Sequence, residues 1–222
     1  MDGNGRWAKK KLLPRLVGHK KGLESVRKII EYCIKYNVKT LTIYAFSTEN
    51  WKRPIKEVEG LLKLFSESIS KESKKIHSNN IKLKFIGDTS LLTKALQIKI
   101  KEIEKETSRN KRLVLNVALN YGGRLDIVNS VNAFYNNKKK IKKITEKDIN
   151  SGLYTKGQSD VDLLIRTGGQ QRMSNFLLWQ SAYAELFFSK KLWPDFDEKI
   201  FVNALYFFQN TERKFGSVSK ST

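Results

Sequence analysis

The chain has a single cysteine, and no apolar run in it approaches the roughly 20 residues that a membrane-spanning helix needs. Cys33 cannot form an internal disulfide because there is no second cysteine, and its neighbours Ile29, Ile30 and Ile34 indicate helix packing rather than a nucleophile. The charged residues Lys9–Lys11 are not followed by the apolar run of a signal peptide. We therefore expect a soluble, cytoplasmic protein.

Acidic residues are also scarce. The 22 aspartates and glutamates stand against 43 lysines and arginines, which gives a net charge of +21 and a sequence pI of about 9.9. This excess favours polyanionic partners: nucleic acid, an anionic membrane surface or phosphorylated small molecules. Many lysines stand in runs such as Lys138–Lys140, and most of these are more simply explained as a solvated surface. Five arginines lie within three residues of Gly, Asn or Ser instead, where their planar guanidinium groups suit diphosphate oxygens: Arg6, Arg53, Arg124, Arg166 and Arg172.

Length and hydrophobic periodicity predict one α/β domain over residues 1–222. The chain is 40% hydrophobic, enough for one sizeable core, and no composition shift divides it. The predicted helices cover 23–34, 58–69, 92–103, 127–134, 175–183 and 200–208, and the predicted strands cover 40–45, 81–86, 113–119, 161–165 and 186–188. A further capped helix start is expected at Thr145. Such alternation is typical of an open, mostly parallel central sheet flanked by helices.

The segments that follow the predicted strands are rich in glycine, asparagine and arginine. In a parallel sheet, ligands bind at the carboxyl ends of the strands, where glycine lets backbone N–H groups approach an anion. The segment Asp2–Arg6 has the same composition, so it too should follow a strand. The sequence starts at Met1, and we therefore expect the first strand of the sheet to be missing from this chain, with residues absent upstream or a poorly folding form as the alternatives.

Four multi-residue motifs resemble the cis-prenyltransferase family, in order along nearly the whole chain. They are Asp2–Ala8 (DGNGRWA), Ser47–Pro54 (STENWKRP), Asn120–Arg124 (NYGGR) and Arg166–Glu185, which contains RTGGQQRMSNFLLWQ. A glycine pair with an arginine could by itself be a surface turn, whereas the four motifs together are far more specific. The likeness is greatest to bacterial members of the family.

The resemblance implies an Mg²⁺-dependent, homodimeric enzyme that adds isopentenyl diphosphate, with cis double bonds, to an allylic diphosphate such as farnesyl diphosphate. The product would be a long-chain polyprenyl diphosphate, the precursor of the lipid carrier for cell-wall glycan synthesis, and it would bring the protein into peripheral contact with a membrane. Such chemistry needs cations around the departing diphosphate and no water at the carbocation. Apolar positions in 23–34 and 61–69 would line a tunnel with Leu113 near its closed end, although core packing gives the same pattern.

The resemblance also implies a role for individual residues. Asp2 and Glu185 would hold Mg²⁺, and Asn50 would serve the proton transfer within a mobile loop over 47–59. The allylic diphosphate would lie against Gly3, Asn4, Gly5, Arg6, Arg15 and His19, and the isopentenyl diphosphate against Arg166, Arg172, Met173 and Ser174. The closing segment would add Ser47, Thr48, Glu49 and Arg53, with Trp7 and Trp51 against the isoprenoid.

Several of these residues have plainer explanations. His77 is most simply a surface residue, and Trp179 and Trp193 are most simply core aromatics. Glu185 could pair with an arginine without any metal. Two positions depart from the family pattern: Gln170 stands where Glu is common, and Lys214-Phe215-Gly216 stands where an Arg-x-Gly pattern is expected near a dimer-shared site.

Two other functions remain as alternatives. A basic nucleic-acid-binding protein would explain the net charge but not Asp2 or the paired glycines, so we expect no nucleic-acid partner. A non-catalytic subunit of a heteromeric prenyltransferase would normally lack the N-terminal motif, whereas this chain keeps Asp2, Asn4 and Arg6. An active enzyme is therefore the favoured function.

Overall fold

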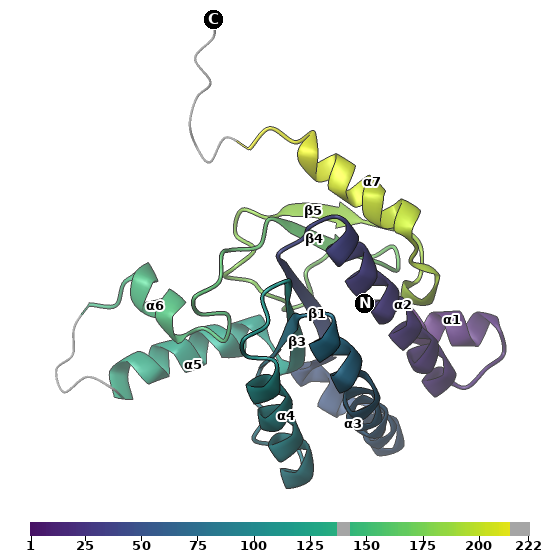
Figure 1. Ribbon diagram of the computed structural model, residues 1–222, viewed down its shortest axis with the longest axis horizontal. Coiled ribbons are helices and arrows are strands. Elements are labelled where there is room, and N and C mark those ends of the chain that lie inside the picture. The colour runs from purple at the N-terminus through teal and green to yellow at the C-terminus, as the bar shows by residue number, and fades with distance from the viewer. Residues whose placement is uncertain (137–142, 214–222) are drawn as a thin grey trace, which may run out of the picture.

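The computed structural model describes residues 1–136 and 143–213. Its centre is a three-stranded parallel sheet in the order β1-β3-β2, made of β1 (Thr40–Ser47), β3 (Leu113–Tyr121) and β2 (Ile81–Ile86) (Figure 1). β3 lies between its neighbours and is buried along nearly its whole length, which suits a strand that is apolar on both faces. The parallel register brings the carboxyl ends of all three strands to one edge.

A second parallel sheet is formed by β4 (Leu163–Arg166) and β5 (Glu185–Phe188). A cavity of about 480 Å³ lies between the two sheets and is lined by residues of β1, by residues of β4 and by Met1. No strand among residues 1–136 and 143–213 pairs with the edges that β1 and β4 present to this cavity. The structure therefore confirms the expected mostly parallel sheet.

Helices cover the sheets on both sides. They are α1 (Asn4–Lys10), α2 (Arg15–Lys35), α3 (Ile55–Ser78), α4 (Lys94–Glu106), α5 (Gly123–Asn136), α6 (Glu146–Gly152) and α7 (Glu198–Gln209), with short 3-10 helices η1 (Thr48–Lys52) and η2 (Trp193–Asp195). The main core joins one face of the first sheet to α2, α3, α4 and α7. A second, smaller core is formed by a separate cluster of buried residues around Tyr121 and Leu177. α5 and α6 lie side by side at the left of Figure 1.

Local signals explain where several helices begin. Pro14 and Pro54 stand directly before α2 and α3, positions where the missing N–H costs nothing. Thr145 and Asp148 form a reciprocal capping box at the start of α6, which confirms the helix start expected there. Residues 47–59, expected to form a loop, contain η1, which also has a capping box, and the first turn of α3.

The predicted helix over 175–183 is wrong. Ser174, Asn175 and Leu177 have φ angles of 49°, 60° and 45°, and the segment forms turns. The backbone oxygen of Asn175 accepts from Gly123 N at 2.7 Å and its side-chain oxygen accepts from Arg124 N at 2.9 Å. These groups satisfy the start of α5, so they are not available to a helix of their own. Helix α1 was not predicted, and β4 begins two residues later than predicted.

Candidate active site

Asp2 lies at the carboxyl end of β4, between two arginines. Its Oδ1 is 3.1 Å from Arg6 Nη2 and its Oδ2 is 3.1 Å from Arg166 Nη2. Its backbone N donates to Thr167 Oγ1 at 3.0 Å, and its backbone O accepts from Trp193 N at 3.0 Å. Burial alone would raise the pKa of Asp2, but hydrogen bonds from Arg166 and Arg6 outweigh it and lower that pKa. Asp2 is therefore an ionised carboxylate at neutral pH.

The glycines around Asp2 are required by close contacts. Gly3 has φ 114°, and a Cβ on it would lie 2.8 Å from Leu192 Cδ2. A Cβ on Gly5 would lie 3.0 Å from the guanidinium carbon of Arg15. Asn4 packs so closely on α2 that a Cβ on Gly18 would lie 2.1 Å from its backbone O. These contacts hold α1 against α2 and aim its first turn at the site.

A second cationic group lies where α2 meets α3. Arg15 Nη2 and Arg53 Nη1 are each 3.2 Å from the same oxygen of Glu57, so two guanidinium groups share one carboxylate. His19 lies beside them and is mostly buried, and its Nε2 makes no hydrogen bond within the described part of the chain. Burial, followed by the charge of Arg53, lowers the pKa of His19 to about 4. This group therefore combines a neutral imidazole with a net positive charge.

The loops after β1, β2 and β3 meet at one edge, as the sequence analysis predicted. Trp51 Nε1 donates to Asn120 Oδ1 at 2.8 Å, and Asn120 Nδ2 donates to the backbone O of Asp88 at 2.7 Å. Trp51 also packs edge-on against Phe46. Its indole N–H is thus committed to the scaffold, leaving only the ring for the predicted isoprenoid contact.

η1 carries the remaining residues predicted for this edge. Asn50 Oδ1 accepts from Ser47 N at 3.2 Å as part of the capping box, and Glu49 Oε1 accepts from Asn175 Nδ2 at 2.8 Å. Thr48 lies so near Gly122 that a Cβ there would be 2.8 Å from Thr48 Oγ1. The structure thus brings Ser47, Thr48, Glu49 and Asn50 to the end of β3.

Arg166 connects Asp2 to the loop predicted for isopentenyl diphosphate. Its Nη1 donates to Ser174 Oγ at 2.7 Å and to the backbone O of Arg172. Arg172 is exposed and donates to Gln170 Oε1 at 2.6 Å, so the neutral Gln170 keeps the acceptor role of the Glu that is common there. Met173 lines the cavity between the sheets. The four predicted residues of this group therefore lie together.

Glu185 is the predicted residue that the structure does not bring to Asp2. It pairs with Leu163 at the start of β4, whereas Asp2 contacts Arg166 at the end, three residues or roughly 10 Å further along. Its Oε1 is 4.0 Å from Arg213 Nε. No group of three His, Cys, Asp or Glu side chains suited to a metal occurs among the residues that the structure describes. Lys214-Phe215-Gly216 lies outside those residues.

Most of the residues that were predicted to be merely structural or on the surface are so in the structure. Cys33 is buried, and burial raises the pKa of its thiol to about 12. His77 is exposed and Trp193 is in the core, as predicted. Trp179 is only half-buried and donates to Asn150, so the core assignment was wrong for it. Trp7, predicted to meet isoprenoid, donates to Asp195 Oδ1 at 2.8 Å.

Three residues of the site were missed by sequence reasoning: Glu57, Thr167 and Asn175. Glu57 follows Arg53 by four residues and pairs with it, but both lie in the predicted loop over 47–59, before the predicted helix over 58–69, so helical spacing did not indicate this pair. Its contact with Arg15, 42 residues away, and the contacts of Asn175 with η1 and α5 have no local signal. These contacts form only when the folded chain brings the loops together, so the sequence alone could not predict them.

An apolar cavity of about 170 Å³ lies between α2, α3 and the first sheet. It is lined by residues at the helical spacing noted in the sequence, among them Leu23, Val26, Ile30, Phe65 and Ile69. β3 contributes Leu115 and Val117, whereas Leu113 is buried beyond the cavity. Within the described ranges, no helix is both long and apolar enough to cross a membrane.

Comparisons with known proteins show the family and the fold of this chain. The chain is 49% identical to a ditrans,polycis-undecaprenyl-diphosphate synthase ((2E,6E)-farnesyl-diphosphate specific) of Pasteurella multocida, over 99% of this chain and 93% of that protein. A synthase of the same description from Yersinia pseudotuberculosis is 48% identical, over 99% and 88%. The crystal structure of lavandulyl diphosphate synthase from Lavandula x intermedia, in complex with dimethylallyl diphosphate, superposes with a TM-score of 0.93 at 32% identity, over 97% and 95%. Residues 1–216 match the Prenyltransf model, described as "Putative undecaprenyl diphosphate synthase", and the chain belongs to this prenyltransferase family.

Proposed function

We propose that this chain condenses isopentenyl diphosphate units, with cis double bonds, onto farnesyl diphosphate to make a long-chain polyprenyl diphosphate, precursor of the lipid carrier for cell-wall glycan synthesis. In each cycle the allylic C–O bond breaks, diphosphate leaves, a C–C bond forms to the isopentenyl unit, and that unit loses a proton. The observation that carries the proposal is the convergence of Arg6, Arg166 and the Arg15–Arg53 pair at one sheet edge. The relatives described above support it.

The allylic diphosphate is assigned to the first turn of α1 and to the Arg15–Arg53 group. Glu57 neutralises only one of the two guanidinium charges, so the pair keeps a net attraction for an anion. His19 is neutral and its Nε2 makes no hydrogen bond to a described residue, so this ring nitrogen is available to a phosphate oxygen. Gly3–Arg6 adds backbone groups and one further cation.

The isopentenyl diphosphate is assigned to Arg166, Arg172, Met173 and Ser174. Two cations and a hydroxyl converge there, and Arg166 also contacts Asp2, so this subsite adjoins the departing diphosphate. Asn50 is assigned to positioning for the proton loss, because an amide orients a donor or acceptor but does not itself act as a base at neutral pH. Ser47, Thr48 and Glu49 lie beside it, with Arg53 closing the site.

Mg²⁺ is assigned to Asp2 together with phosphate oxygens of the substrate. A single ionised carboxylate suits this ion, which is usually held by one or two carboxylates, water and substrate phosphates. When bound, Mg²⁺ neutralises charge that develops on the departing diphosphate. Glu185 lies roughly 10 Å from this position, so we assign it to the same ion only if a second copy of the chain or a bridging diphosphate brings it there. Arg6 and Arg166 hold the carboxylate in place until substrate arrives.

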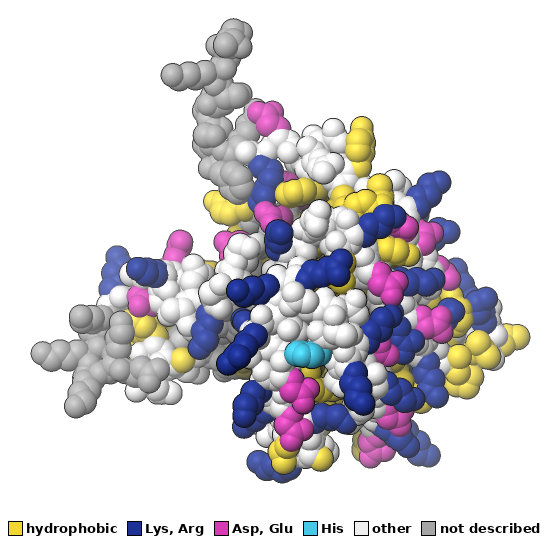
Figure 2. Space-filling view, viewed as in Figure 1, with side chains coloured by type: hydrophobic (Ala, Val, Ile, Leu, Met, Phe, Trp, Pro, Cys, Tyr) yellow, Lys and Arg dark blue, Asp and Glu magenta, His cyan; other side chains and the backbone are white. Residues whose placement is uncertain are grey.

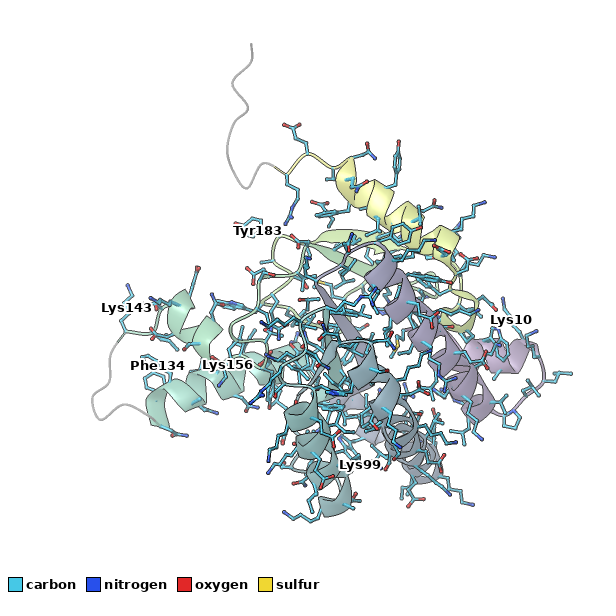
Figure 3. All side chains as sticks on the ribbon, viewed as in Figure 1. Lys10, Lys99, Phe134, Lys143, Lys156 and Tyr183 are labelled. Carbon is cyan, nitrogen blue, oxygen red and sulfur yellow. The ribbon has the colours of Figure 1, made fainter. Side chains whose placement is uncertain are left out.

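The growing chain is assigned to the apolar cavity between α2 and α3, whose lining suits a hydrocarbon. We also propose a cytoplasmic homodimer. The face around β5 and α7 exposes Tyr183, Leu186, Tyr206 and Phe207, an apolar patch that suits a second copy (Tyr183 is labelled in Figure 3).

The test is direct synthesis. Purified protein is incubated with Mg²⁺, farnesyl diphosphate and labelled isopentenyl diphosphate, and the products are separated by chain length. We expect labelled polyprenyl products far longer than the primer, and none when Mg²⁺ is chelated. Absence of label from polyprenyl products, with protein shown by circular dichroism to be folded, would refute the proposal.

A further inference from the structure

The turn between α1 and α2 presents large apolar side chains to solvent. Leu12 is 96% exposed, more than any other large hydrophobic residue that the structure describes. Leu13, Leu16 and Val17 beside it are between 37% and 40% exposed. We call these four residues the apolar turn. Figure 2 shows hydrophobic side chains at the right edge of the molecule, where Figure 1 places this turn.

Folding alone does not explain a leucine at position 12. Its φ is 55°, in the left-handed region. Leu12 N donates to Lys9 O at 3.1 Å and Leu13 N donates to Ala8 O at 2.9 Å, the two bonds of a Schellman motif. The residue at this position of the motif is usually glycine, because a side chain is strained there. Leu12 is thus both strained and unburied, which points to a ligand outside the chain.

The apolar turn is surrounded by positive charge. Lys9, Lys10 and Lys11 precede it, and Lys20 follows within the first turns of α2, whereas Lys21 is paired with Glu24. No Asp or Glu occurs from residue 3 to residue 23. The carboxylates that approach from other elements, Glu57 and Asp195, are engaged by Arg15 and by Trp7 Nε1. Figure 3 labels Lys10 on α1 at the outer edge of the molecule.

We propose that the apolar turn docks this protein on the surface of an anionic lipid bilayer. Leucine side chains enter the boundary between headgroups and acyl chains, while the lysines meet anionic headgroups. Nucleic acid offers no apolar layer for Leu12. A second copy of the chain would bring the same lysines against each other, which like-charge repulsion opposes. Docking here would place the first turns of α2 and α3, joined by Arg15 and Glu57, toward the bilayer.

Co-sedimentation with vesicles tests the proposal without any substrate. The full chain should bind vesicles that contain phosphatidylglycerol, bind pure phosphatidylcholine vesicles far more weakly, and release as salt rises. Leu12→Gly should weaken binding about tenfold by removing an inserted side chain, while its melting temperature stays equal or rises because the strained conformation suits glycine. Lys9→Glu combined with Lys10→Glu should weaken binding at least about tenfold.

Matched controls lie on and before α4. Leu91 is 64% exposed, and Lys94 and Lys101 are exposed on α4, so Leu91→Gly and the combined Lys94→Glu and Lys101→Glu should each bind like the parent. Equal binding by Leu12→Gly and the parent, or equal binding to neutral and anionic vesicles, would overturn the proposal. It would also be overturned if Leu12→Gly lowered the sedimentation coefficient of lipid-free protein, because the turn would then be a contact between copies.

Discussion

Asp2 is held between Arg6 and Arg166 without a contribution from the hydrophobic core. Asp2→Asn should therefore cost less than about 1 kcal/mol of stability, since both pairs are partly exposed. Turnover should fall at least about a hundredfold, because the change removes the charge that would hold Mg²⁺ against the departing diphosphate. The measurements are kcat from labelled isopentenyl diphosphate and the melting temperature. Glu102→Gln, an exposed carboxylate on α4, is the matched control, and near-normal kcat in Asp2→Asn would show that the metal binds elsewhere.

His19 should make stability depend on pH. Its pKa is lowered to about 4 in the folded protein, mainly by burial, and is about 6.5 when unfolded. Between these values the unfolded chain binds more protons, so the free energy of unfolding falls as pH drops from 6.5 toward 4, by up to roughly 3 kcal/mol. Urea unfolding of the parent and of His19→Gln at pH 5 and pH 7.5 measures this difference. The same pH dependence in both proteins would contradict a buried neutral imidazole.

At the scale of elements, the helices and strands with strong periodicity were predictable, because apolar spacing reports directly which face is buried. The turns over 175–183 were not predictable, because the spacing of Phe176, Leu177 and Leu178 suits a helix as well as it suits turns. Its true conformation is decided by Asn175, whose polar groups bond to Glu49 on η1 and to the start of α5. Those partners are 126 and 51 residues away in sequence, beyond any local pattern.

Asn175→Ala should therefore destabilise the junction of η1 and α5. It removes two side-chain hydrogen bonds and places alanine at φ 60°, for a total of about 2–4 kcal/mol. Asn175→Gly relieves the backbone strain while still lacking the bonds, so it should lie between the parent and the alanine variant. Urea unfolding curves of the three proteins give the comparison, and equal stability of all three would mean that Asn175 does not determine this turn.

At the scale of the whole molecule, two cavities organise the chain: one between the two sheets and one between α2, α3 and the first sheet. The apolar spacing predicted which helix faces would be apolar, whereas the tunnel that they line was implied only by the family resemblance and not by the spacing. Apolar side chains on facing elements either fill the space between them or leave a cavity, and the outcome depends on the combined volume of side chains from several elements. Leu113 illustrates this, because it is fully buried yet does not line the cavity.

Ala45 has the smallest side chain among the residues that line the cavity between α2 and α3. Ala45→Leu should fill part of this space and shift the product distribution to shorter chains, since each added isoprenoid unit needs room there. Chromatography of labelled products by chain length measures the shift. Ala95→Leu, at an exposed position on α4, should leave the distribution unchanged, and unchanged products from both variants would place the growing chain outside this cavity.

The central claim is that two diphosphates bind side by side at the carboxyl edge of the sheets. Calorimetric titration with isopentenyl diphosphate and an unreactive farnesyl thiolodiphosphate, in the presence of Mg²⁺, tests it most directly. The two ligands should bind simultaneously, one of each per chain, with Arg15→Ala weakening only the farnesyl analogue and Arg172→Ala weakening only isopentenyl diphosphate. Mutual displacement of the two ligands, or equal weakening of both by either variant, would contradict it.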